Sequence, residues 1–213
     1  MFTQEWSSVN SLIDELFMTH EGETALIIGN GPSLKEIPDE LLNKYVSFGC
    51  NRIWEREGFE PDYHVAVDGW VPEENELDYH ALTSVTLLPL DFLGKWQADY
   101  YFTHDYHPMW IMEKDLKPSY LRKPGIGWVG CPHAMLQIAF FMGFEKFLCV
   151  GLDNTATGKH FYERETVDRR VDADLWEWGF AVLRDCFIPR VILNISDYTE
   201  LETLPRADWR NFL

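Results

Sequence analysis

The fold is decided by residues 25–34, ALIIGNGPSL, in which four apolar residues are followed by GNG at 29–31 and PSL at 32–34. A short continuous apolar run is typical of a strand that is buried on both faces of a parallel sheet. A proline directly after the glycines is typical of a helix start, because its missing N–H leaves nothing unpaired there. The stretch therefore predicts a buried strand and a glycine-rich turn into a helix.

Apolar runs of the same kind predict further strands at residues 45–50, 63–67, 84–88, 99–102, 146–150 and 190–194. Helical patterns precede or separate them at residues 7–19, 39–44, 134–144 and 172–186. Because strands and helices alternate, the predicted fold class is α/β, with a Rossmann-like, mostly parallel sheet flanked by helices. We expect one domain over residues 1–213, in which residues 69–124 form an irregular, aromatic-rich insertion packed over one edge of the sheet.

Composition narrows the classes of partner. The formal net charge of −17 repels polyanions, which argues against nucleic acid and anionic membrane surfaces. No stretch approaches the roughly 20 apolar residues of a membrane span, and the N-terminus lacks the pattern of a signal peptide. The four cysteines form no CxxC pair, which fits a reducing compartment. We therefore expect a cytoplasmic protein that binds small molecules, and a homo-oligomer is left open.

In open parallel sheets ligands bind outside the carboxyl ends of the strands, so the residues after each predicted strand are the first site candidates. These are Gly29, Asn30, Gly31, Pro32 and Ser33 after the first strand, Asn51 after the second, Asp68 after the third, and Gly151 and Asp153 after the strand at 146–150. Glycine leaves room for a phosphate beside the backbone, and outward-facing amides at a helix start favour an anion. The alternative is a tight turn without a ligand, since the third glycine of the dinucleotide fingerprint is absent and no Gly-Lys-Ser/Thr follows.

The chain resembles the MptE-like hydroxymethylpterin diphosphokinase family in GNGPSL at 29–34, in Asn51, in residues 61–68, and in the stretches 151–153 and 158–160. GNGPSL and Asn51 also resemble the bacterial lipooligosaccharide sialyltransferases, which share a related nucleotide-binding fold. The resemblance spans about residues 25–68 and continues from about residue 125. Either relationship implies a Rossmann-like domain that binds a nucleotide and transfers part of it.

The sialyltransferase resemblance implies a CMP-sugar as the nucleotide donor. It would place Asn30, Gly31 and Ser33 near the phosphate and ribose of the donor. Asn51 would hydrogen-bond the donor, and residues 151–153 would line its base or ribose. In both families a small-residue segment before an apolar helix lies opposite GNGPSL and contacts the ligand. Gly127 belongs to the matching segment of this chain.

His160 is the predicted catalytic base. In the sialyltransferases the base is a histidine farther along the chain that is followed by an aromatic residue. This chain lacks the long loop before that histidine, and if the loop is deleted, His160, followed by Phe161, takes its place. An imidazole can accept the proton of an acceptor hydroxyl near neutral pH. Basic residues gather around it and would either neutralise a polyphosphate or form a solvated face: Lys159, Arg164, Arg169 and Arg170. A surface histidine without a role remains the alternative for His160, and a turn-forming side chain remains the alternative for Asn51.

Asp68 distinguishes the diphosphokinase resemblance from the sialyltransferase resemblance. A diphosphokinase must hold Mg²⁺ against ATP, and a carboxylate at a strand end is a natural ligand for that metal, whereas the sialyltransferases work without a metal. The alternative is that Asp68 caps the next segment. Glycosyl transfer is preferred because aromatic side chains in the middle of the chain would stack on sugars, unless they fill the core: Trp70, Trp96, Tyr100, Tyr101, Tyr106 and Trp110. A third hypothesis is a catalytically inactive nucleotide-binding protein.

Two further clusters are discounted. Residues 104–107, HDYH, lack the i, i+4 spacing of a helical metal pair and a cysteine partner, so a solvated loop is the better interpretation. Cys131 and His133 open a predicted helix, where neighbouring side chains point in different directions. We therefore predict no thiol–imidazole nucleophile at that helix.

Overall fold

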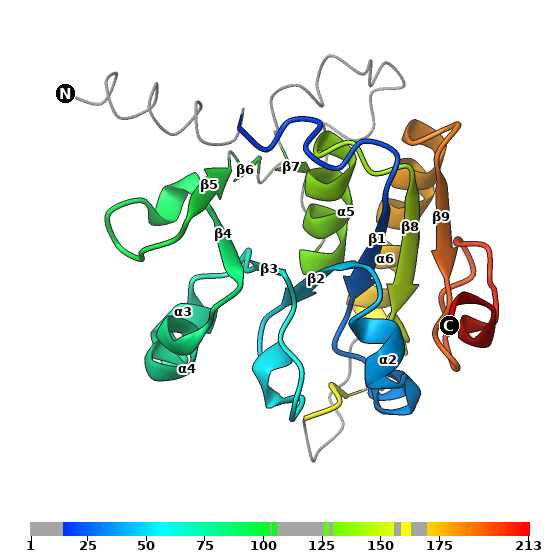
Figure 1. The fold of residues 1–213 in the computed structure, drawn as a ribbon, viewed down its shortest axis with the longest axis horizontal. Coiled ribbons are helices and arrows are strands. Elements are labelled where there is room, and N and C mark those ends of the chain that lie inside the picture. The colour runs from blue at the N-terminus through cyan, green and yellow to red at the C-terminus, as the bar shows by residue number, and fades with distance from the viewer. Residues whose placement is uncertain (1–14, 103, 106–125, 128–129, 156–158, 163–169) are drawn as a thin grey trace.

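A seven-stranded sheet forms the centre of the protein (Figure 1). The computed structural model describes residues 15–102, 104–105, 126–127, 130–155, 159–162 and 170–213. The strand order is β5-β4-β3-β2-β1-β8-β9, and every neighbouring pair is parallel. A separate parallel pair is formed by β6 (His104–Asp105) and β7 (Ile126–Gly127). The predicted α/β, Rossmann-like class is confirmed.

Each predicted strand is present, with ends that differ by no more than two residues. The strands of the main sheet are β1 (Thr24–Ile28), β2 (Val46–Cys50), β3 (Tyr63–Val65), β4 (Val85–Pro89), β5 (Tyr100–Phe102), β8 (Lys146–Val150) and β9 (Val191–Asn194). The α-helices are α2 (Asp39–Leu42), α3 (Trp70–Glu74), α4 (Glu76–Ala81), α5 (Cys131–Phe141) and α6 (Arg170–Cys186). Short 3-10 helices are η1 (Pro32–Glu36), η2 (Ile53–Glu55), η3 (Leu90–Phe92) and η6 (Trp209–Phe212).

Two helix predictions need correction. α5 begins at Cys131 and ends at Phe141, whereas the apolar pattern predicted residues 134–144. Pro132 stands in the first turn of α5, where its fixed φ suits a helix start, and Gly143 adopts φ +97 just beyond the end. Of the helix predicted at 7–19, residues 7–14 lie outside the described residues, and residues 15–19 form turns.

The insertion predicted at 69–124 differs from the structure over its described part. Residues 70–102 continue the alternation of helix and strand, and β4 and β5 extend the main sheet instead of packing over its edge. The physical reason is that β4 is buried on both faces. Leu87 belongs to the core cluster that also contains residues of α5, and Leu88 packs with Tyr79 and Tyr101 in a separate cluster.

Alternating residues of β1 show how both faces of the sheet are covered. Ala25 and Ile27 belong to a core cluster that includes residues of α5 and α6, whereas Leu26 and Ile28 belong to a second cluster with residues of η1 and α2. α5 and α6 lie on one side of the sheet in Figure 1, and α2 lies on the other. This two-sided burial explains why the strands appear in the sequence as continuous apolar runs.

The strand order places a topological switch point between β1 and β8. From β1 the chain proceeds outward through β2, β3 and β4 to β5, and it then returns to place β8 on the other side of β1. The loops after β1 and β8 therefore leave the sheet side by side and in different directions. In sheets of this kind the ligand crevice lies at that point.

Candidate functional site

The two strand exits at the switch point are in backbone contact. The Gly29 amide donates to Val150 O, and the Gly31 amide donates to Gly151 O, each at 2.8 Å. A Cβ on Gly29 would lie 2.5 Å from Gly151 O, closer than atoms approach without a bond. Gly151 also adopts φ +65, a left-handed conformation that favours glycine. These glycines therefore allow the β1 and β8 loops to pack against each other.

Asp153 lies where the sequence predicted a bound anion. Its Oδ2 accepts a 2.8 Å hydrogen bond from the Ser33 amide at the start of η1, and its Oδ1 accepts from the Ser33 hydroxyl. A Cβ on Gly31 would lie 2.5 Å from Asp153 Cγ, so only glycine leaves room for this carboxylate. Burial raises the pKa of Asp153, and the two hydrogen bonds from Ser33 oppose that shift. The anion that the Ser33 amide holds is thus an internal side chain.

The expectation that the amides of residues 29–33 face outward toward a phosphate is not met. Gly29, Gly31 and Ser33 donate within the protein, as described above, and the Leu34 amide donates to Gly31 O at 3.0 Å. Pro32 has no amide proton. In the part of the chain that the structure describes, only the Asn30 amide of this segment lacks an internal acceptor. The carbonyls of Val150 and Gly151 accept two of these amides in place of a phosphate. The sequence pattern did not show that β8 and its loop would lie beside this turn.

The Asn30 side chain is buried at the same place, with 6% of its surface exposed. Its Nδ2 donates to Cys50 O at 3.0 Å. Its Oδ1 is enclosed and has no donor among the described residues. A buried acceptor without a partner calls for an explanation, and a ligand hydroxyl or amino group would satisfy it.

Asn51 leaves β2 in a left-handed conformation, with φ +51. Its backbone oxygen lies 2.8 Å from His64 Nε2, and its side-chain Oδ1 accepts from Cys131 Sγ at 3.3 Å. The side chain is half-buried. Asn51 is thus held by neighbours from β3 and from the start of α5.

Cys131 and His133, at the start of α5, have different partners. Whereas Cys131 contacts Asn51, His133 Nε2 lies 3.4 Å from Trp176 O, and its ring packs on Phe180 with centroids 4.1 Å apart. Burial lowers the pKa of His133 to about 4. Its imidazole is therefore neutral at neutral pH.

His160 belongs to a segment that lies across the turn after β1. The Phe161 amide donates to Asn30 O at 2.7 Å, and the Phe161 ring is buried in the cluster that contains Leu34. The half-buried His160 stacks on Tyr162, with ring centroids 5.1 Å apart. The guanidinium of Arg52 lies over the Tyr162 ring, 5.0 Å from its centroid. The predicted base is thereby brought to the edge of the sheet that also carries Asn30 and Asn51.

Asp68 and Gly127 lie on other elements. Asp68 is half-buried beyond the end of β3, and its backbone oxygen accepts from the Val71 amide at 3.3 Å. Gly127 pairs with Asp105 in the β6–β7 sheet, before α5. Among the described residues, no three His, Cys, Asp or Glu side chains form a group suited to a metal ion. Magnesium binding by Asp68 stays a prediction.

The aromatic residues of the middle region mostly fill the core. Trp96 and Tyr101 pack in the cluster between β4 and α4, and Tyr100 packs against the main core. Trp70 is 39% exposed. Tyr106 and Trp110 lie outside the described residues, as do His107 of the HDYH stretch and the basic residues Arg164 and Arg169.

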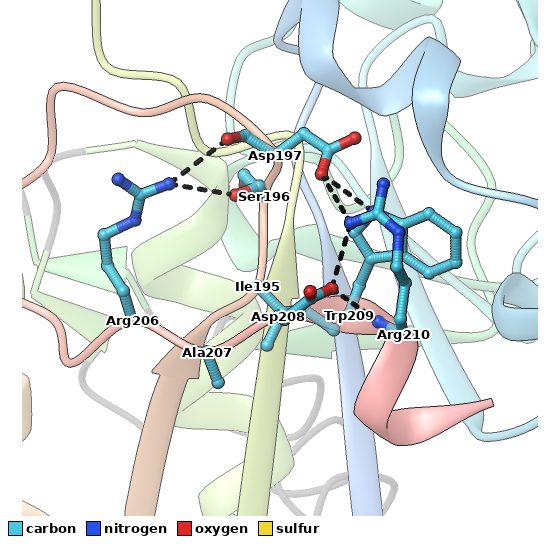
Figure 2. Close-up of a pocket in the computed structure, with 8 residues that line it drawn as sticks. All are labelled: Ile195, Ser196, Asp197, Arg206, Ala207, Asp208, Trp209 and Arg210. Atoms are coloured by element: carbon cyan, nitrogen blue, oxygen red, sulfur yellow. Dashed lines mark hydrogen bonds and ion pairs between the residues drawn. The ribbon is translucent and has the colours of Figure 1, made fainter.

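A separate pocket of about 430 Å³ lies beside the end of β9 (Figure 2). Its arginines bond within the pocket: Arg206 donates to the backbone oxygen of Asp197 at 3.2 Å, and Arg210 lies 3.0 Å from an Asp208 carboxylate oxygen. It adjoins the candidate site through Ser196, whose hydroxyl accepts from the Leu152 amide at 3.2 Å. None of the predicted site residues lines this pocket.

Sequence reasoning did not predict the contacts that three residues make at the site. His64 is buried within β3 and bonds to Asn51, Arg52 covers Tyr162, and Phe161 fixes the His160 segment. A histidine inside an otherwise apolar strand was a usable signal for His64. The contact between Arg52 and Tyr162 joins residues 110 positions apart and left no local pattern.

Comparison with solved structures extends the fold assignment. The sialyltransferase CstII from Campylobacter jejuni, in complex with cytidine-5'-monophosphate, superposes with a TM-score of 0.58 and 15% identity, over 88% of this chain and 86% of that chain. A second CstII structure, in complex with CMP-3FNeuAc, gives a TM-score of 0.51 and 13% identity, over 86% and 84% of the two chains. At these identities the likeness establishes a shared fold.

Sequence comparisons add nothing further: no family model and no curated protein matches the chain. The resemblance to the MptE-like family gains no support. In the described part of the chain, no helix is long and apolar enough to cross a membrane.

Proposed function

We propose that this chain is a glycosyltransferase that uses a CMP-sugar donor, bound at the switch point between β1 and β8. The observation that carries the proposal is the gathering of Asn30, Asn51 and His160 at that edge of the sheet, through the Phe161–Asn30 hydrogen bond and the stacked Tyr162 and Arg52. Support also comes from the fold, which is shared with a sialyltransferase whose structures are complexes with cytidine-5'-monophosphate and CMP-3FNeuAc.

In this proposal Asn30 and Asn51 contact the nucleotide directly. Asn30 offers a buried acceptor, Oδ1, and a backbone amide without an internal acceptor. Among the described residues the Nδ2 group of Asn51 has no acceptor, since only its oxygens are engaged, so it offers donors to phosphate or base oxygens. Asp153 and Ser33 bond to each other, and together with Gly29, Gly31 and Gly151 they shape the turn.

The proposed chemistry is displacement at the anomeric carbon of the donor sugar. His160 takes the proton of the acceptor hydroxyl as the new C–O bond forms, and CMP leaves with the electrons of the broken bond to its phosphate oxygen. General-base assistance of this kind contributes roughly 10²- to 10⁴-fold in rate. This proposal assigns no residue as a metal ligand. Asp68 would bind Mg²⁺ only in the diphosphokinase-like alternative.

The test measures transfer and hydrolysis of CMP-sugars in wild type and in His160→Ala, together with CMP affinity by calorimetry. We expect His160→Ala to lose at least about 10²-fold in rate while CMP affinity stays within about threefold. His80→Ala is the matched control, because His80 is exposed on α4. CMP binding without turnover in wild type would indicate a non-catalytic nucleotide-binding protein. Mg²⁺-dependent binding of ATP in preference to CMP would indicate the diphosphokinase-like alternative.

A further inference from the structure

His64 is a fully buried polar residue that the proposed chemistry does not use. It lies in β3, with 0% of its surface exposed, and it packs against the rings of Trp54 and Tyr79, whose centroids are 5.5 and 6.0 Å from its own. Burial lowers its pKa to about 4, so it is neutral at neutral pH. Its one hydrogen bond among the described residues joins Nε2 to Asn51 O, at 2.8 Å.

The chemistry of that bond fixes the tautomer of His64. A backbone oxygen only accepts, so the proton of the neutral ring must be on Nε2. The other nitrogen, Nδ1, then carries a lone pair, and it has no donor among the described residues. His64 consequently acts as a single, fixed donor aimed at the carbonyl of Asn51.

That carbonyl belongs to a residue whose backbone needs support. Asn51 adopts φ +51, a left-handed conformation that is unfavourable for a non-glycine residue unless neighbours hold it there. The conformation determines where the Asn51 side chain lies relative to Cys131 and to the edge of the sheet. His64 reaches the backbone of Asn51, and Cys131 reaches its side chain.

We propose that His64 is a positioning residue for nucleotide binding, which holds Asn51 in its left-handed conformation so that the Asn51 amide faces the donor. This inference rests on the proposed function of the switch-point edge. His64 does not contact the ligand in this proposal, and its whole effect passes through Asn51.

A double-mutant cycle on CMP affinity tests this dependence. His64→Asn moves the donor back to about the position of Nδ1 and breaks the bond to Asn51, whereas the longer His64→Gln keeps an N–H near the position of Nε2. We expect roughly tenfold weaker CMP binding in His64→Asn, as for the loss of one hydrogen bond, and a change of less than about threefold in His64→Gln. In an Asn51→Ala background His64→Asn should change CMP affinity by less than about twofold.

His133→Asn is the matched control, since His133 is equally buried and also faces a backbone carbonyl. It should lower thermal stability as His64→Asn does and leave CMP affinity unchanged. Equal losses of affinity with and without the Asn51 side chain, or equal binding by His64→Asn and wild type, would overturn the positioning role alone. Failure of wild type to bind CMP would overturn the proposed function and this inference together. If His64→Asn does not fold, the same cycle is run with His64→Gln and His64→Met, and the same two outcomes decide.

Discussion

Ser33 and Asp153 are joined by two hydrogen bonds across the switch point, although 120 positions separate them in the sequence. The Ser33 amide and hydroxyl each donate to one carboxylate oxygen of Asp153, and both residues are buried. The start of η1 is therefore paired with a carboxylate from the β8 loop. This pairing holds the turn that carries Asn30, so an internal carboxylate stabilises the proposed site.

Removing the Asp153 carboxyl should destabilise the fold. In Asp153→Ala both Ser33 donors lose their acceptor in a buried site, which costs about 1–3 kcal/mol. Asp153→Asn should cost less, because its amide oxygen still accepts from the Ser33 amide and its NH₂ group can donate to the hydroxyl. Urea unfolding at neutral pH measures both values. Equal stability of Asp153→Ala and wild type would show that this pairing contributes nothing.

Because the pKa of Asp153 is raised, the stability of the folded protein should depend on pH in a predictable direction. The folded protein binds the proton more readily than the unfolded chain, so the carboxyl favours folding below its ordinary pKa of 3.8. That contribution is lost as pH rises through the folded value. Wild type should therefore gain stability relative to Asp153→Asn as pH is lowered from neutral toward 3.8. A difference that is constant over this range, or that changes in the opposite direction, would contradict the shift.

Gly31→Ala tests whether the glycine is required by packing. Gly31 has φ −64, which alanine adopts without strain, so any cost must come from the added methyl group. That methyl would lie 2.5 Å from Asp153 Cγ and 2.7 Å from Gly151 O. We expect a loss of about 1–3 kcal/mol in unfolding free energy, as for other overpacked sites. Gly58→Ala is the comparison, since Gly58 has open space around it and φ +77, so it reports the backbone cost alone.

The buried imidazole of His133 should make the protein less stable in mild acid. Its pKa is lowered to about 4, so below pH 6.5 the unfolded chain binds a proton that the folded protein does not. Stability present near neutral pH is lost as pH falls toward 4. Between pH 7 and about pH 4.5, the free energy of unfolding should fall by about 2 kcal/mol less in His133→Phe than in wild type. Urea unfolding at the two pH values measures this difference. A His133→Phe pH profile identical to that of wild type would contradict the assignment.

Phe161 connects stability with the position of the predicted base. Its ring is 7% exposed in the cluster around Leu34, so Phe161→Ala should lower the unfolding free energy by about 3 kcal/mol. The Phe161 amide still donates to Asn30 O in this variant, but the ring that packs the His160 segment against Leu34 is gone. His160 should therefore lose its fixed position, and the transferase rate should fall. Phe17→Ala, at a 45% exposed ring, should cost less and leave the rate unchanged. Loss of stability with an unchanged rate would separate Phe161 from His160.

The strands could be predicted from the sequence because a parallel sheet buried on both faces leaves continuous apolar runs, of which residues 25–28 are the clearest. The residues at the strand ends could be predicted as well, since topology alone brings Asn30, Asn51 and Asp153 to one edge. The packing partners of GNGPSL, residues 29–34, could not be predicted. Its glycines leave room for Gly151 and Asp153, and nothing local to residues 29–34 indicates which distant loop will lie there.

Hydrogen–deuterium exchange with and without saturating CMP tests the central claim most directly, because it shows where on the chain the nucleotide binds. CMP should slow amide exchange in peptides covering residues 29–34, 51–55 and 151–155, at the carboxyl ends of β1, β2 and β8. Protection confined to residues 195–210, around the pocket beside β9, or no protection anywhere, would contradict a nucleotide site at the switch point.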